Sequence, residues 1–145
     1  MGDTPLGRLL QEAQRALADE WLQSMSERGY PDVKAGHAAV FANIDRRAGT
    51  RLTELARRAR MSKQGMMLMV DELEERGYVR RVPDPDDGRA KVVKLTASGR
   101  RCVAEARRVI QAVEGRTRRT LGDRRYETLR SSLATLIGEE EEPTE

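Results

Sequence analysis

The spacing of apolar residues changes once along this chain, and that change constrains the fold more than any other feature. Over most of the 145 residues, apolar side chains recur every three to four positions, the period of an amphipathic helix. Over residues 78–82 and 91–96 the pattern instead fits two short strands. The segment between them contains Asp87-Gly88, a strong hairpin-turn signal, and prolines that a central strand does not tolerate. The sequence therefore predicts a mainly α fold with a small β-wing.

Six helices are expected around this hairpin, and their boundaries follow from capping residues and glycines. Thr4 is expected to cap the first helix, with Pro5 in its first turn and Gly29 at its end. The second helix is expected to start near Val33. The second helix is expected to end before Gly49, and Thr53 is expected to cap the third helix. Ser62 is expected to cap the fourth helix, which ends at Gly77. The fifth helix is expected to begin after Thr96 or Ser98, and the sixth to be capped near Asp123.

Composition limits the class of protein. The single Cys102 excludes an internal disulfide framework, fits a reducing compartment, and falls on an apolar helix stripe where we expect it to be buried. No run of about 18 apolar residues and no signal peptide is found, so we expect a cytoplasmic protein without a membrane partner. With one Cys, one His and no metal-ligand cluster or phosphate-binding loop, we expect no enzyme activity, no cofactor and no metal.

The charge of the chain points to a polyanionic partner. The formal net charge is +3, but five of the 24 acidic residues lie in the segment 139–145, which is expected to be a disordered acidic tail. The rest of the chain carries 27 basic against 19 acidic side chains. A body this basic suits a nucleic acid, although a helical protein with solvated arginines has the same composition.

Residues 53–76 have the pattern of two helices joined by the short segment 60–62, which is typical of a helix-turn-helix. In such units the start of the second helix enters the major groove of DNA. That start consists of Ser62, Lys63 and Gln64, which can bind phosphate, guanine and adenine respectively. Met67 and Leu68 fall near the exposed side of this helix. They can contact thymine methyl groups or pack against a neighbour.

The hairpin places Arg89 at its tip, where an arginine suits a narrow and electronegative minor groove. Asp87 is expected to hold the guanidinium of Arg89, and Lys91 follows on the second strand. Asp84 and Asp86 bring further negative charge toward the same surface, so at least one of the three aspartates is expected to be neutralised by Arg89. The alternative is ordinary turn chemistry with a solvated arginine.

Three further arginines and three possible pocket residues complete the candidates. Arginines around the helix-turn-helix are expected to contact phosphates, namely Arg51, Arg57 and Arg60. The cleft candidates are Trp21, His37 and Phe41, although each can also be an ordinary core residue, and His37 a bonded or exposed one.

The ordered motifs of this chain resemble the MarR family of bacterial regulators. The residues that carry the resemblance are Leu52–Ala56, Leu73–Val79, Asp87–Ala90, Leu95-Thr96 and Gly99. The resemblance implies a homodimer in which each winged helix-turn-helix binds half of a near-palindromic DNA site. It also implies a cleft for a small lipophilic or phenolic acid that releases the DNA. The run Met66–Met69 departs from the family, whose recognition helix is richer in hydroxyl and basic residues.

Dimerisation is also expected from the apolar stripes on the first, fifth and sixth helices, which lie outside the winged unit and need burial. The alternative is that these helices pack only within one chain. The expected organisation is a dimerisation helix in 1–32, the DNA-binding region in 33–98, two dimerisation helices in 99–138 and the tail in 139–145. We expect a DNA-binding repressor, and the alternative is an architectural or protein-interaction winged helix without sequence preference.

Overall fold

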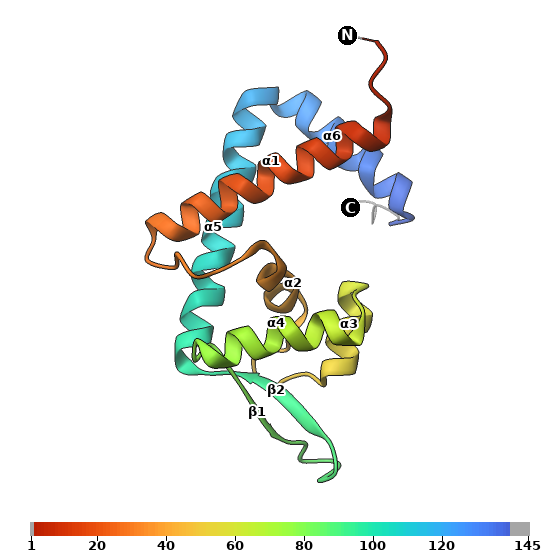
Figure 1. Cartoon of the computed structure of the whole chain (residues 1–145). Coiled ribbons are helices and arrows are strands. Elements are labelled where there is room, and N and C mark those ends of the chain that lie inside the picture. Colours follow the sequence, from red (N-terminus) through yellow and green to blue (C-terminus); the bar gives the residue numbers. More distant parts are fainter. Residues whose placement is uncertain (1, 140–145) are drawn as a thin grey trace, which may run out of the picture. The chain divides into compact units, whose positions relative to one another are not determined.

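The structure is a computed structural model that describes residues 2–139 (Figure 1). The expected tail lies outside these residues except for Glu139. The described chain contains, in order, α1 (Leu6–Glu27), α2 (Ala35–Asn43), α3 (Leu52–Ala59), α4 (Lys63–Glu75), β1 (Val79–Pro83), β2 (Lys91–Leu95), α5 (Ala97–Leu121) and α6 (Asp123–Ile137). The mainly α fold with a small β-wing is confirmed. The chain divides into two compact units between Val109 and Ile110.

Two predicted helix caps are wrong. Thr4 does not cap α1, because Pro5 itself takes the N-cap position with φ −55° and ψ 143°, and no side chain bonds to the helix end. Thr53 does not cap α3 and lies already inside the helix. The cause is local. The backbone of Thr50 is paired with Val93, so the chain leaves this pairing and turns into the helix before it reaches Thr53.

Helices α2, α3 and α4 pack on one another and form the core beside the hairpin. The turn between α3 and α4 is short because Arg60 adopts the left-handed conformation, with φ 52°, and the backbone N–H of Met61 donates to the carbonyl of Ala56 at 2.9 Å. This arrangement confirms the predicted helix-turn-helix. Side chains with almost no exposed surface in this core include Leu55, Met66, Leu73, Val40, Val70 and Val79.

The hairpin is anchored to the start of the helix-turn-helix. Strands β1 and β2 pair antiparallel from Val79 opposite Leu95 to Pro83 opposite Lys91. Thr50 adds a bridge to Val93 through two backbone hydrogen bonds of 2.9 and 2.8 Å. Figure 1 shows the hairpin in green, projecting beyond α3 and α4. Its outer end is therefore free to contact another molecule while its base is fixed.

A compact joint links the end of α4, the hairpin and the start of α5. The hydroxyl of Thr96 donates to the carbonyl of Gly77 at 2.6 Å and accepts from the N–H of Gly99 at 3.0 Å. The carbonyl of Tyr78 accepts from the N–H of Thr96 at 3.0 Å and lies directly against Gly99. A Cβ atom at Gly99 would lie 1.8 Å from this carbonyl oxygen, so only glycine fits.

A buried histidine joins α2 to α4. His37 is completely buried, and its Nδ1 accepts from the backbone N–H of Lys34 at 3.0 Å. Its Nε2 lies 2.7 Å from Oε2 of Glu72, so the neutral ring carries its proton on Nε2 and donates to the carboxylate. Glu72 also accepts from Nζ of Lys34 at 3.1 Å. The ring both caps α2 and fixes the position of α4.

The end of α1 packs against the first half of α5. Trp21 donates from Nε1 to the carbonyl of Ala106 at 3.3 Å, and Arg28 pairs with Glu105 at 2.5 Å. Cys102 is completely buried, as expected, and burial raises the pKa of its thiol to about 12. The thiol is therefore a packing group and not a reactive one.

The second unit comprises the end of α5 and α6. Tyr126 is buried, and the guanidinium of Arg118 lies 4.6 Å from the centre of its ring. Arg118 also bonds to Asp123 at 3.0 Å and to Glu127. Among the helices that the structure describes, none is long and apolar enough to cross a membrane.

We predict that Gly99→Ala destabilises the protein by about 1–3 kcal/mol or more, because the new methyl group must displace the backbone of Tyr78. Urea unfolding at one fixed protein concentration measures the change. The control is Gly7→Ala in α1, where nothing lies within 4 Å of the new Cβ and the change stays within about 1 kcal/mol. Equal stability of the two variants would contradict the tight joint.

We also predict that acid weakens the fold through His37. Burial is the largest cause that lowers the pKa of His37 below its ordinary value of 6.5. The folded state therefore binds fewer protons than the unfolded state. The contribution of neutral His37 to the free energy of unfolding is complete above pH 6.5 and is lost as the pH falls below that value. The loss is at most about 1.4 kcal/mol per pH unit for one proton.

Urea unfolding over a pH series from about 7 to about 5 measures this loss. The pKa of Glu72 is lowered by its hydrogen bonds from His37 and Lys34, so the carboxylate stays ionised over this range. His37→Gln removes the titrating ring, and its stability is expected to change less with pH. A variant with the same pH dependence as the natural protein would rule out His37 as the cause.

Candidate nucleic-acid interface

The first turn of α4 presents polar groups outward. Ser62 caps the helix, and its Oγ accepts from the N–H of Gly65 at 3.0 Å, as predicted. Lys63 and Gln64 are exposed, and within residues 2–139 the ammonium of Lys63 has no hydrogen-bond or ion-pair partner. The predicted outward direction of these side chains is confirmed. The helix end combines free backbone N–H groups with an unpaired cation.

Three of the four carboxylates in the second half of α4 are bonded to basic groups of the protein. Arg81 on β1 pairs with Asp71 at 2.5 Å and with Glu74 at 2.8 Å. Glu72 is held by His37 and Lys34. These carboxylates therefore oppose an approaching polyanion much less than their number in the sequence indicates.

The tip of the hairpin presents Arg89. The N–H of Ala90 donates to the carbonyl of Asp87 at 3.0 Å, which closes the turn. The structure differs from the prediction for Asp87, because its Oδ1 accepts from the backbone N–H of Arg89 at 3.1 Å and not from the guanidinium. The guanidinium has no partner in the part of the chain that the structure describes. Asp87 shapes the turn and leaves the Arg89 side chain available.

Arg51 neutralises Asp84 at the start of the hairpin loop, a role that the sequence predicted for Arg89. Its Nε and Nη2 lie 2.7 and 2.6 Å from Oδ2 of Asp84, which is only 8% exposed. The N–H of Asp86 donates to Oδ1 of Asp84 at 2.9 Å. This backbone bond, followed by the bond from Arg51, lowers the pKa of Asp84. Arg51 therefore links the start of α3 to the hairpin.

The other two predicted phosphate-binding arginines differ from each other. Arg57 bonds to Glu54 through Nε at 2.9 Å and Nη2 at 2.5 Å, and Arg58 joins the same carboxylate. These bonds lower the pKa of Glu54 to about 2. Arg60 is exposed in the turn before α4, with no side-chain partner among residues 2–139. Of the three, only Arg60 has its charge available without breaking an existing bond. Lys91 is also exposed, on β2.

The three cleft candidates are buried core residues. Trp21 and Phe41 are each 6% exposed, and His37 is fully buried with both ring nitrogens bonded. A cavity of ≈ 420 Å³ lies elsewhere, beside Arg51, Glu54 and Asp84. None of the three cleft candidates lines it.

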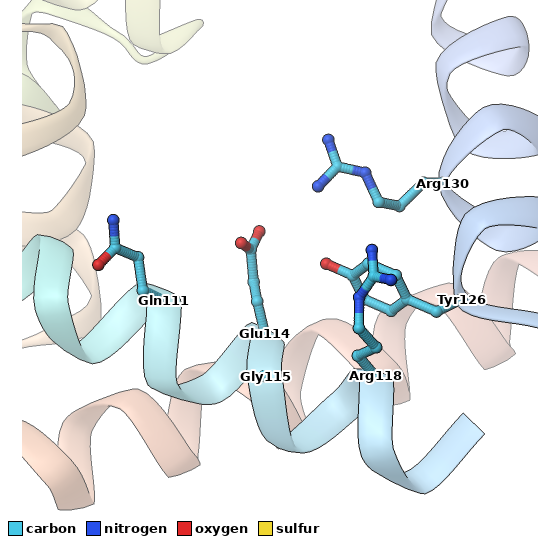
Figure 2. A pocket seen from close by; sticks show the side chains of 6 residues that line it. All are labelled: Gln111, Glu114, Gly115, Arg118, Tyr126 and Arg130. Atoms are coloured by element: carbon cyan, nitrogen blue, oxygen red, sulfur yellow. The ribbon is translucent and has the colours of Figure 1, made fainter. Parts of the chain in front are cut away.

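A second cavity of ≈ 280 Å³ lies between the end of α5 and α6 (Figure 2). Figure 2 shows Arg118 of α5 and Arg130 of α6 both near Tyr126, with Glu114 one turn before Arg118 on α5. Both guanidinium groups lie over the tyrosine ring, at 4.6 and 5.9 Å from its centre. The cavity carries mixed charge and belongs to the unit that lacks the helix-turn-helix.

One residue that shapes the interface was not singled out from the sequence. Arg81 on β1 bonds to Asp71 and Glu74 of α4. The acidic run at the end of α4 was a usable signal, because a helix that approaches DNA needs its carboxylates compensated. The choice of Arg81 over the adjacent Arg80 depends on which face of β1 packs beside α4, which requires the strand register.

Comparison with known proteins agrees with this geometry. The MarR family model matches residues 32–90. The HTH-type transcriptional repressor Rv2887 of Mycobacterium tuberculosis is 30% identical over 114 residues, which span 79% of this chain and 80% of the relative. The repressor CouR bound to a 23-mer DNA duplex is 28% identical, with a TM-score of 0.78 over 92% of each chain.

CouR from Rhodococcus jostii RHA1 bound to p-coumaroyl-CoA is 25% identical, with a TM-score of 0.73 over 97% of this chain and 94% of that chain. The solved structures share the fold described above, and the family model and the repressor of 30% identity show the family. The chain belongs to the MarR family of winged helix-turn-helix transcriptional regulators, DNA-binding proteins that are not enzymes.

Proposed function

We propose that this protein is a repressor that binds a near-palindromic operator as a homodimer and is released by a small lipophilic or phenolic effector. The observation that carries the proposal is the contrast in pairing on the helix-turn-helix and hairpin. The acidic groups Asp71, Glu74 and Asp84 are bonded to arginines, whereas Lys63 and Arg89 have no partner among the described residues. Unpaired cations at two projecting positions are suited to two grooves of one duplex.

The proposed contacts follow from the chemistry of each group. Lys63 donates to guanine and Gln64 pairs with adenine in the major groove, while the capped helix end at Ser62 binds phosphate. Arg89 enters the minor groove, where a narrow groove concentrates negative potential. Lys91 supports it from β2. In this proposal Asp87 has no contact with DNA and acts by holding the turn.

Phosphate contacts are proposed for Arg60 rather than for all three predicted arginines. Arg51 and Arg57 are already bonded to Asp84 and Glu54, and a phosphate would have to replace these carboxylates. Arg60 can bind a phosphate without breaking an existing ion pair, and it lies in the turn that precedes the recognition helix α4. The phosphate contacts that position the protein along the DNA are therefore proposed at this turn and at the amino-terminal end of α4.

Exposed apolar side chains support the homodimer. In α1 only Trp21 and Met25 are buried, although the helix has 22 residues. Large apolar side chains that remain exposed lie on α1, α5 and α6, and they are Leu6, Leu9, Leu10, Leu17, Ile110, Leu129, Leu136 and Ile137. A two-fold partner would cover them and place two copies of α4 about 34 Å apart, the spacing of successive major grooves.

The effector is proposed by analogy with CouR, which has been solved bound both to DNA and to p-coumaroyl-CoA. Trp21, His37 and Phe41 remain the candidate ligand residues. A ligand that bonds to His37 must displace either the backbone N–H of Lys34 or the carboxylate of Glu72. Since Glu72 is part of α4, the second event would release one of the bonds that position the recognition helix.

We predict that Arg89→Ala weakens binding to a duplex selected by the protein from a random pool by about 1–3 kcal/mol, because the minor-groove contact is lost. Titration of labelled duplex at two salt concentrations measures the affinity. The matched control is Arg107→Ala, which removes an exposed arginine of α5 outside the interface and is expected to bind like the natural protein. An unchanged affinity of Arg89→Ala at both salt concentrations would contradict the proposed role of the hairpin.

The same titration separates a repressor from an architectural protein. A sequence-specific regulator is expected to prefer the selected duplex over random duplex by about 10³-fold or more. Equal affinity for the selected duplex and for random duplex would support the architectural alternative and would contradict the proposed function.

We predict that Ile137→Asp weakens the dimer, because a charge placed on an apolar contact must be desolvated. Sedimentation over a range of protein concentrations is expected to show monomers at concentrations where the natural protein is dimeric. Thr135→Asp places the same charge on an exposed position of the same helix outside the apolar stripe and is expected to stay dimeric. A stable Ile137→Asp dimer would exclude this face of α6 from the interface.

A further inference from the structure

The outward face of α4 carries an apolar patch, which we define as the side chains of Met67 and Leu68. The side chains of Met67 and Leu68 are 44% and 55% exposed, although the helix that carries them packs against the core. Their neighbours Met66 and Val70 are completely buried on the opposite side of the helix. Met69 also turns inward, because its sulfur fills the space over Gly36 of α2. The patch is therefore not part of the core packing.

The position of the patch makes it continuous with the proposed DNA-binding surface. Residues three and four positions apart share one face of a helix, so Met67 and Leu68 follow directly after Gln64. The next residue on that face is Asp71, whose carboxylate is paired with Arg81 at 2.5 Å. The patch thus lies between exposed polar donors and a neutralised carboxylate. A helix that inserts its first turn into the major groove brings these positions toward the bases next.

We infer that Met67 and Leu68 bind thymine methyl groups and so determine part of the operator sequence. The C5 methyl group of thymine is the apolar group that base edges display in the major groove. Neither side chain can donate a hydrogen bond, so neither discriminates among bases through donors and acceptors. An apolar pair in contact with base edges therefore selects thymine by burying its methyl group.

This inference rests on the proposed function and gives it a specific content. The competing occupant of the patch is a second protein. Continuity with Ser62, Lys63 and Gln64 favours DNA, because a protein seated on the patch would cover the unpaired ammonium of Lys63. The operator is accordingly expected to carry thymines where α4 passes its second turn.

The test uses the full-length protein and the duplex that it selects from a random pool. Each thymine of one half-site is replaced in turn by deoxyuridine, which removes the methyl group and keeps the base pair. Affinity is expected to fall about fourfold for each methyl group that the patch contacts. Met67→Gln and Leu68→Asn, which keep the side-chain size but are polar, are expected to bind the thymine duplex more weakly and to lose the response to deoxyuridine.

Glu75→Ala is the matched control on the same helix, since Glu75 is exposed beyond the patch and is expected to keep both the affinity and the deoxyuridine response. The inference is overturned if the natural protein binds thymine and deoxyuridine duplexes equally while still preferring them to random DNA. It is also overturned if the patch variants keep the full response. Absence of any preference for the selected duplex would instead remove the proposed function itself.

Discussion

The hydroxyl of Thr96 holds together the three elements on which the interface depends. By bonding at once to Gly77 at the end of α4 and to Gly99 in the first turn of α5, it fixes the hairpin between two helices. The space for this joint exists because Gly99 has no side chain against the backbone of Tyr78. The motif formed by Leu95, Thr96 and Gly99 therefore has a structural role, because it fixes the orientation of the hairpin relative to α4 and α5. The bonds of Arg81 to Asp71 and Glu74 add a second connection between β1 and α4.

Pairing of charges decides what this surface can bind. The helix-turn-helix and hairpin contain acidic as well as basic residues, and an unpaired carboxylate on this surface would repel DNA. Arg81 and Arg51 remove much of this opposition by bonding to Asp71, Glu74 and Asp84. Lys63 and Arg89, which have no partner among residues 2–139, lie at the start of α4 and in the hairpin loop. Specificity can then reside in a few groups whose positions are fixed by the core.

Sequence periodicity was sufficient for the elements but not for the charge pairing. The change of period located the hairpin within one residue, and Ser62 and the glycines identified the ends of α4 correctly. Thr4 and Thr53 failed as caps because a proline in one case and the bridge from Thr50 to Val93 in the other set the helix start.

The partners of Asp84 and Asp87 could not be predicted from the sequence. Asp84 pairs with Arg51, which lies 33 residues earlier in the chain, and Asp87 accepts a hydrogen bond from the backbone N–H of Arg89. Such contacts depend on strand register and turn geometry rather than on residue type. The same limit applied to Arg81, whose selection over Arg80 follows from the face of β1 that lies beside α4.

The internal bonds of the arginines have a consequence for the ionic atmosphere of a bound duplex. DNA releases condensed counterions in proportion to the phosphates that a protein neutralises, and this release makes affinity depend on salt concentration. Arg51, Arg57 and Arg81 already have carboxylate partners and so contribute little net charge to that exchange. The salt dependence of DNA binding is therefore expected to reflect fewer displaced ions than the arginine content of the helix-turn-helix and hairpin would indicate.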